Sequence, residues 1–62
     1  MHYEIEYIGI NECTNKEELK TLWVEGSRNT LLVTVKDFRN SGVEITEVCR
    51  VNRNCIYTPI KI

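Results

Sequence analysis

The sequence predicts a small α+β domain: a small antiparallel sheet with one short helix packed on one face, in the order β-α-β-β-β along the chain. Apolar and polar residues alternate at Tyr3–Tyr7 and at Val43–Thr46, which is typical of strands. A helix-capping motif at Thr14–Glu17 precedes apolar residues at helical spacing. A chain of 62 residues has room for one hydrophobic core, so residues 1–62 are expected to form a single domain.

The first expected strand lies at the N-terminus. Its β-favouring residues Tyr3, Ile5 and Tyr7 fall on one side of an extended chain, and the residues between them are polar. After Tyr7 the alternation stops at Ile8-Gly9-Ile10, where Gly9 indicates a bulge or the close approach of another backbone. This end of the strand is expected to be covered on both faces.

A helix is expected from about Asn15 to Glu25. The Thr14 hydroxyl and the Glu17 carboxylate are spaced to cap each other's backbone N–H groups. Apolar side chains then recur at i, i+3 and i+4, and a glycine follows where a left-handed cap is wanted: Leu19, Leu22, Trp23 and Gly26.

A competing interpretation makes Thr21–Glu25 a strand that turns through Gly26–Asn29 into the next one, because Thr, Trp and Val all suit a sheet. Under that alternative the protein is a mostly-β domain of five strands.

The next two strands are expected to form a hairpin that carries much of the core. Leu31–Val35 is rich in strand formers, Val43–Thr46 alternates, and the polar connection Arg39–Gly42 lies between them. Gly42 would supply the positive φ that such a turn usually needs.

The C-terminal third is expected to hold the remaining strands. Val48–Val51 is out of phase with Val43 and Ile45, which indicates a bulge near Glu47 or a change of face. A turn at Asn52–Asn54 then leads into a last strand with alternating residues Ile56, Thr58, Ile60 and Ile62. Pro59 cannot donate to a ladder, so this strand is expected at a sheet edge.

Three cysteines are an odd number, which favours free thiols and a cytoplasmic location over a secreted disulfide scaffold. Cys13 and Cys49 are interpreted as small buried hydrophobes. A zinc site built from them with Cys55 and His2 is disfavoured, because no pair has the tight spacing of a zinc knuckle. The longest apolar run, Leu31–Val33, is far too short to cross a membrane.

The sequence contains no recognisable catalytic apparatus. His2, the sole histidine, lies at a terminus, and the three glycines stand apart from one another, so neither a nucleophile–base pair nor a phosphate-binding loop is expected. We therefore expect no enzymatic activity, no catalytic or metal-binding residues and no cofactor.

Charge is divided unevenly along the chain. Before Ser27 six carboxylates face two lysines, a net −4, and from Ser27 onward six cations face three carboxylates, a net +3. The basic part has two aromatic residues near its cations, which allows a nucleic-acid-binding surface as one hypothesis. The overall charge of −1 and the absence of a known nucleic-acid-binding motif argue against it.

Self-association is expected, because so short a chain has a thin core and carries apolar residues on both sides of its strands: Ile8, Ile10, Leu32, Ile60 and Ile62. We expect a homodimer.

The preferred hypothesis is a small, non-catalytic protein-binding module, acting as an inhibitor, adaptor or regulator of another protein, as small phage and mobile-element proteins often do. The alternative is a small nucleic-acid-binding regulator that uses a basic C-terminal face. The candidate partner-binding residues are Arg39, Arg50, Arg53 and Tyr57.

Overall fold

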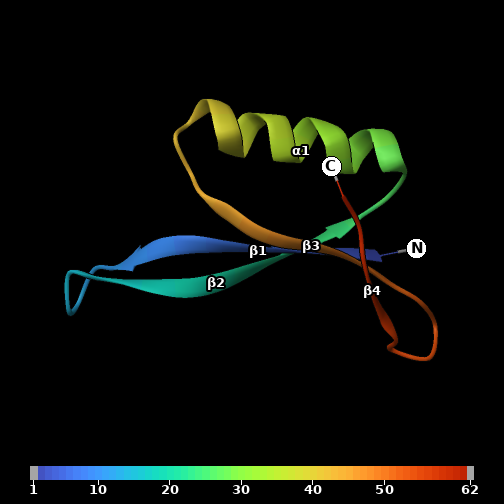
Figure 1. Ribbon diagram of the computed structural model, residues 1–62, viewed down its shortest axis with the longest axis horizontal. Coiled ribbons are helices and arrows are strands. Elements are labelled where there is room, and N and C mark those ends of the chain that lie inside the picture. The colour runs from blue at the N-terminus through green and yellow to red at the C-terminus, as the bar shows by residue number, and fades with distance from the viewer. Residues whose placement is uncertain (1, 62) are drawn as a thin grey trace.

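The computed structural model describes residues 2–61, which form one four-stranded antiparallel sheet with a helix across one face (Figure 1). The α+β class with a small antiparallel sheet and one helix is confirmed. The elements along the chain are β1 (His2–Asn11), β2 (Lys16–Glu25), α1 (Arg28–Asn40), β3 (Ile45–Val51) and β4 (Tyr57–Pro59). The helix therefore follows the second strand, one place later than expected, and the spatial order of the strands is β2-β1-β3-β4.

The segment predicted to be a helix, from Asn15 to Glu25, is the strand β2 instead, so that prediction is wrong. Asn15 adopts a left-handed φ of 57°, and its N–H donates to the Asn11 carbonyl at 2.7 Å, which closes a hairpin. A capping box contributes about 1 kcal/mol, less than a ladder of ten residue pairs with β1 that also buries Val24. The alternative strand at Thr21–Glu25 is confirmed.

The segment predicted to be the first strand of a central hairpin, Leu31–Val35, lies inside α1, so both the hairpin and the five-stranded alternative are wrong. Ser27 caps this helix, and its side chain accepts the Thr30 N–H at 3.4 Å. Leu31 and Val35 are one helical turn apart and fully buried, so packing at helical spacing outweighs the strand propensity of the β-branched residues.

Residues 41–43 end the helix rather than turn a hairpin. The Ser41 N–H donates to the Asp37 carbonyl at 3.0 Å, and Gly42 has a φ of 81°. The positive φ expected at Gly42 is confirmed, but it serves a helix C-terminus.

The expected bulge near Glu47 is confirmed. Glu6 pairs with Glu47, but the next β1 residue, Tyr7, pairs with Ile45, so Thr46 is the extra residue. The Thr46 hydroxyl lies 2.8 Å from a carboxylate oxygen of Glu6 and 3.1 Å from its carbonyl oxygen, and it donates to these acceptors. The bulge shifts the register so that Ile45 and Val48 both pack against the core.

The turn at Asn52–Asn54 and the edge position of the last strand are also confirmed. The Asn52 side-chain oxygen accepts the N–H groups of Asn54 at 2.9 Å and Ile56 at 3.1 Å. β4 covers only Tyr57–Pro59, shorter than the expected strand, whose last residue, Ile62, lies outside the described residues.

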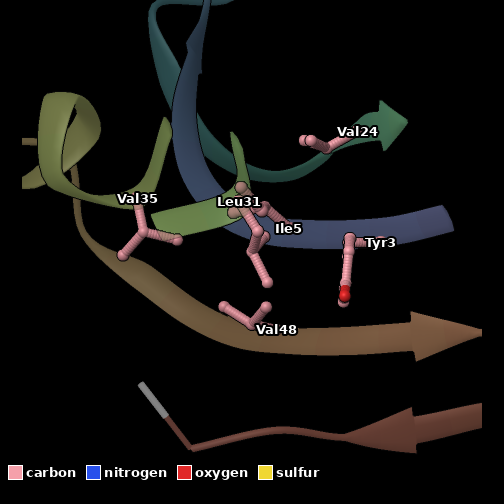
Figure 2. Close-up of a cluster of buried hydrophobic side chains, with 6 residues drawn as sticks. All are labelled: Tyr3, Ile5, Val24, Leu31, Val35 and Val48. Atoms are coloured by element: carbon pink, nitrogen blue, oxygen red, sulfur yellow. The ribbon is translucent and has the colours of Figure 1, made fainter. Parts of the chain in front are cut away.

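The core lies between α1 and the side of the sheet that faces this helix (Figure 2). Its fully or nearly buried residues come from four elements: Tyr3 and Ile5 of β1, Val24 of β2, Leu31 and Val35 of α1, and Val48 of β3. Tyr7 and Phe38 extend it with an edge-to-face ring contact at 5.0 Å. No helix of the described chain is long and apolar enough to span a membrane.

Candidate protein-binding face

The side of the sheet opposite α1, which we call the open face, has no second layer in the described chain (Figure 1). Residues directly opposite one another in antiparallel strands project to the same side, so the register assigns each side chain to a face. Ile5 and its partners Leu22 and Val48 face the helix, and their sequence neighbours face away. The open face therefore carries the even-numbered residues 2–10 of β1, the odd-numbered residues 17–25 of β2, and Glu47, Cys49, Val51, Tyr57 and Pro59.

Large apolar and aromatic side chains are exposed on the open face. Ile10, Leu19, Trp23 and Tyr57 are 58, 63, 49 and 52% exposed. The other three exposed large hydrophobic residues among the described ones lie on α1 and beside β4: Leu32, Val33 and Ile56. Most of the exposed large hydrophobic side chains therefore share one side of one sheet, which is typical of an interaction surface.

The open face is also acidic. The strand residues that the register assigns to it include five carboxylates and no lysine or arginine: Glu4, Glu6, Glu17, Glu25 and Glu47. The sheet cations Lys16, Lys20 and Arg50 project to the helix side, because their β1 partners Asn11, Tyr7 and Tyr3 do. Eight cations and four carboxylates make the rest of the chain basic. Folding thus separates charge between the two faces of the sheet, which differs from the division along the sequence.

The carboxylates affect the two titratable groups beside them. The nearby Glu4 carboxylate raises the pKa of Tyr57, because it opposes a second negative charge, and desolvation and a hydrogen bond to Glu4 act in the same direction. Desolvation raises the pKa of the Cys49 thiol, and Glu47, Glu4 and Glu6 raise it further. Cys49 is therefore a protonated, weakly nucleophilic thiol at neutral pH.

One end of the open face is hollowed between Trp23 and the β3–β4 turn. This end hollow, about 550 Å³, is lined by His2, Trp23, Arg50, Val51, Asn52, Arg53 and Cys55. Val51 is only 2% exposed although it lies outside the main core, so it forms an apolar floor.

The His2 ring packs against Trp23 with 4.9 Å between ring centroids. Its Nδ1 lies 3.3 Å from a Glu25 carboxylate oxygen, close enough for an ion pair when the ring is protonated, though without hydrogen-bond geometry.

The structure brings together some of the predicted partner-binding residues. Arg50 and Arg53 both line the end hollow, and Tyr57 is directly opposite Val51 on the open face. Arg39 instead lines a separate shallow hollow with Ile45, Thr46, Glu47, Val48, Ile60 and Lys61. The four predicted residues therefore do not form one surface.

The sequence interpretation missed Leu19 and Trp23 as surface residues, because a helix over 15–25 places both in the core. The alternation Glu17, Leu19, Thr21, Trp23, Glu25 was the available signal, since strand spacing puts all five on one side. In the structure they project together from β2.

The cysteines are free, as expected, but Cys13 is exposed in the β1–β2 turn, so its interpretation as a buried hydrophobe is wrong. Cys49 is half-buried and Cys55 is exposed. Within residues 2–61, no three His, Cys, Asp or Glu side chains lie close enough together to hold a metal ion.

Comparisons of the chain with protein-family models, with curated proteins and with solved structures found no significant match. The function is therefore argued from the geometry and charge of the open face.

Proposed function

We propose that this chain is a small, non-catalytic protein-binding module that docks on a basic surface of another protein through its open face. One observation carries the proposal: the strand residues described on that face include exposed aromatic and aliphatic side chains and five carboxylates, but no lysine or arginine. Aromatic side chains such as Trp23 and Tyr57 are the usual energetic anchors of protein interfaces.

Charge complementarity defines the partner. The carboxylates give the open face a formal charge of −5 when His2 is neutral. Such a patch attracts a cationic surface over about 8 Å at physiological ionic strength, and it speeds association and disfavours acidic partners. Trp23 offers a ring on which an arginine or lysine of the partner can stack, with Glu4 directly across the ladder to pair with its charge.

The same charges give little support to the nucleic-acid alternative. A nucleic acid stacking on Tyr57 or Trp23 would bring its phosphates toward Glu4, whereas Arg50 projects to the other side of the sheet. Phosphate binding requires cations beside the stacking rings. Arg50 and Arg53 line the end hollow beside Trp23, but no lysine or arginine is among the strand residues of the open face around Tyr57 and Glu4.

Within the cell, the proposed role is that of an inhibitor, adaptor or regulator, which acts by occupying a surface of its partner. Three free thiols, two of them exposed, suit a reducing compartment such as the cytoplasm.

The test is affinity capture from a lysate of the source organism with the open-face charge altered. The variant Glu4→Gln/Glu6→Gln removes two central carboxylates and leaves an oxygen for the Thr46 hydroxyl to bind. The matched control Glu12→Gln/Glu18→Gln removes the same charge outside the open face, because Glu12 is in the β1–β2 turn and Glu18, opposite Gly9, projects to the helix side. We expect wild type and control to retain one basic protein after nuclease treatment, and the open-face variant to lose it.

Equal capture by both variants, or capture that nuclease abolishes, would contradict the proposal. Binding of the identified partner can then be measured directly by the emission of Trp23, the sole tryptophan of the chain. Its half-exposed ring should shift to shorter wavelength as the partner excludes water.

A further inference from the structure

β2 is a long strand at the edge of the sheet. It covers ten residues, contains no proline, and pairs on one side only, with β1. The opposite edge differs, because β4 has three residues and ends at Pro59. A long edge strand presents a row of unpaired backbone N–H and C=O groups, which is a template for pairing with another strand.

The hydrogen bonds of β1 determine which β2 groups point outward. The Ile8 N–H donates to the Glu44 carbonyl at 2.9 Å, on the β3 side. Because backbone groups alternate sides along a strand, the odd-numbered residues of β1 bond to their even-numbered β2 partners. The free backbone groups of β2 therefore belong to its odd-numbered residues, whose side chains lie on the open face.

From this edge we infer that two copies of the chain pair antiparallel through β2, with the two-fold axis at Thr21, to form one continuous sheet. In this register Leu19 of each copy lies opposite Trp23 of the other. The two most exposed apolar side chains of β2 therefore form two equivalent cross-strand contacts, one on each side of the axis. Centring the pair on Lys20 would set Trp23 opposite Glu17 instead.

The occupant is a second copy because the register is self-complementary. Stacking two open faces would oppose one −5 surface to another, whereas edge pairing keeps them side by side. The cost lies at the ends of the ladder, where Glu17 faces Glu25 of the other copy. Screening weakens that repulsion, so the dimer should tighten as salt is added.

The inference does not rest on the proposed function. Edge pairing uses the backbone of β2 with the side chains of Leu19 and Trp23. Trp23 is shared with the proposed partner surface, but the carboxylates altered in the capture experiment, Glu4 and Glu6, are on β1 in the middle of the sheet. Either claim can fail while the other holds. If both hold, the dimer presents two open faces side by side to its partner.

Disulfide cross-linking tests the register. In a background with Cys13→Ser, Cys49→Ala and Cys55→Ser, Thr21→Cys places two thiols across the two-fold axis, with Cα atoms about 5.5 Å apart, within the usual range for a disulfide. The control Glu17→Cys puts its thiol opposite residue 25, about 27 Å along the strand from its own counterpart. Mild oxidation should cross-link Thr21→Cys and leave Glu17→Cys monomeric. No cross-linking of Thr21→Cys, or equal cross-linking of both, would overturn the register.

Sedimentation equilibrium tests the association itself. Wild type at about 100 µM, a concentration that populates a modest dimer, should have twice the 7.3 kDa mass of the chain. Thr21→Pro removes an outward N–H without breaking the β1–β2 ladder, so it should give a folded monomer. A wild-type mass of one chain at that concentration refutes the dimer whether or not the proline variant folds.

Discussion

Two valine-to-alanine substitutions in α1 should have very different effects on stability. Val35 is 1% exposed and lies in the core, whereas Val33, two residues earlier, is 60% exposed. In a helix these positions point to different sides, but in a strand Leu31, Val33 and Val35 would share one side. The pair therefore tests the helix directly with the same chemical change at both sites.

The magnitudes follow from burial. Val35→Ala removes two buried methyl groups, about 0.8 kcal/mol each by transfer, and the cavity left behind brings the loss to about 2–3 kcal/mol. A chain of this size has a free energy of unfolding of about 3–9 kcal/mol, so Val35→Ala would remove a large part of it. Val33→Ala loses little buried surface, because Val33 is largely exposed. It gains up to about 0.7 kcal/mol of helix propensity. Its effect should be near zero or stabilising.

Urea denaturation followed by far-UV circular dichroism measures both effects. The protein concentration must be the same in each experiment, because self-association adds to apparent stability. Similar losses for the two variants would refute the helical assignment of Leu31–Val35 and favour the strand that the sequence suggested.

Three further outcomes are expected. Glu4→Gln should lower the pKa of Tyr57, which NMR titration of the tyrosine ring measures. Folding raises this pKa, so the contribution of Tyr57 to stability is present at neutral pH and is lost as the pH rises beyond the ordinary tyrosine range. Cys49 should react with a thiol-specific reagent at least about tenfold more slowly than the exposed Cys13, since Cys49 is half-buried and its raised pKa disfavours the thiolate, and mass spectrometry of the labelled peptides checks this. Cys55→Gly should raise the urea midpoint, by up to about 1 kcal/mol in unfolding free energy, because Cys55 has a φ of 59° that costs a non-glycine residue more than glycine; a lower midpoint would contradict this reasoning.

Local patterns predicted those parts of the fold that local chemistry decides. The alternation at Tyr3–Tyr7, the phase shift beside Glu47 and the proline at an edge strand each correspond to what the structure has. The segments around Thr14 and Leu31 were assigned wrongly, because in each a local preference competes with distant packing. The capping motif at Thr14 yields to pairing with β1, and the strand propensity at Leu31 yields to burial against Ile5 and Val48.

The candidate site was less predictable for the same reason. Whether Trp23 is buried or exposed depends on whether its segment is helix or strand, so one wrong element hid the most prominent aromatic residue of the open face. The gathering of Glu4 and Glu47 on one side depends on the β1–β3 register, which joins distant parts of the sequence. Charge counted along the chain could not reveal it.

The central place of β1 in the sheet has a consequence for the order of folding. β1 is made first, and its hairpin with β2 can close locally, but its other neighbour, β3, comes from the far end of the sequence. Pairings so distant along the chain form slowly, because a long loop must be ordered before they stabilise anything. During synthesis the growing chain therefore exposes one edge of β1, with Ile5 uncovered, until α1 and β3 have emerged. Rapid pairing of β3 with β1 then prevents this edge from pairing with other chains.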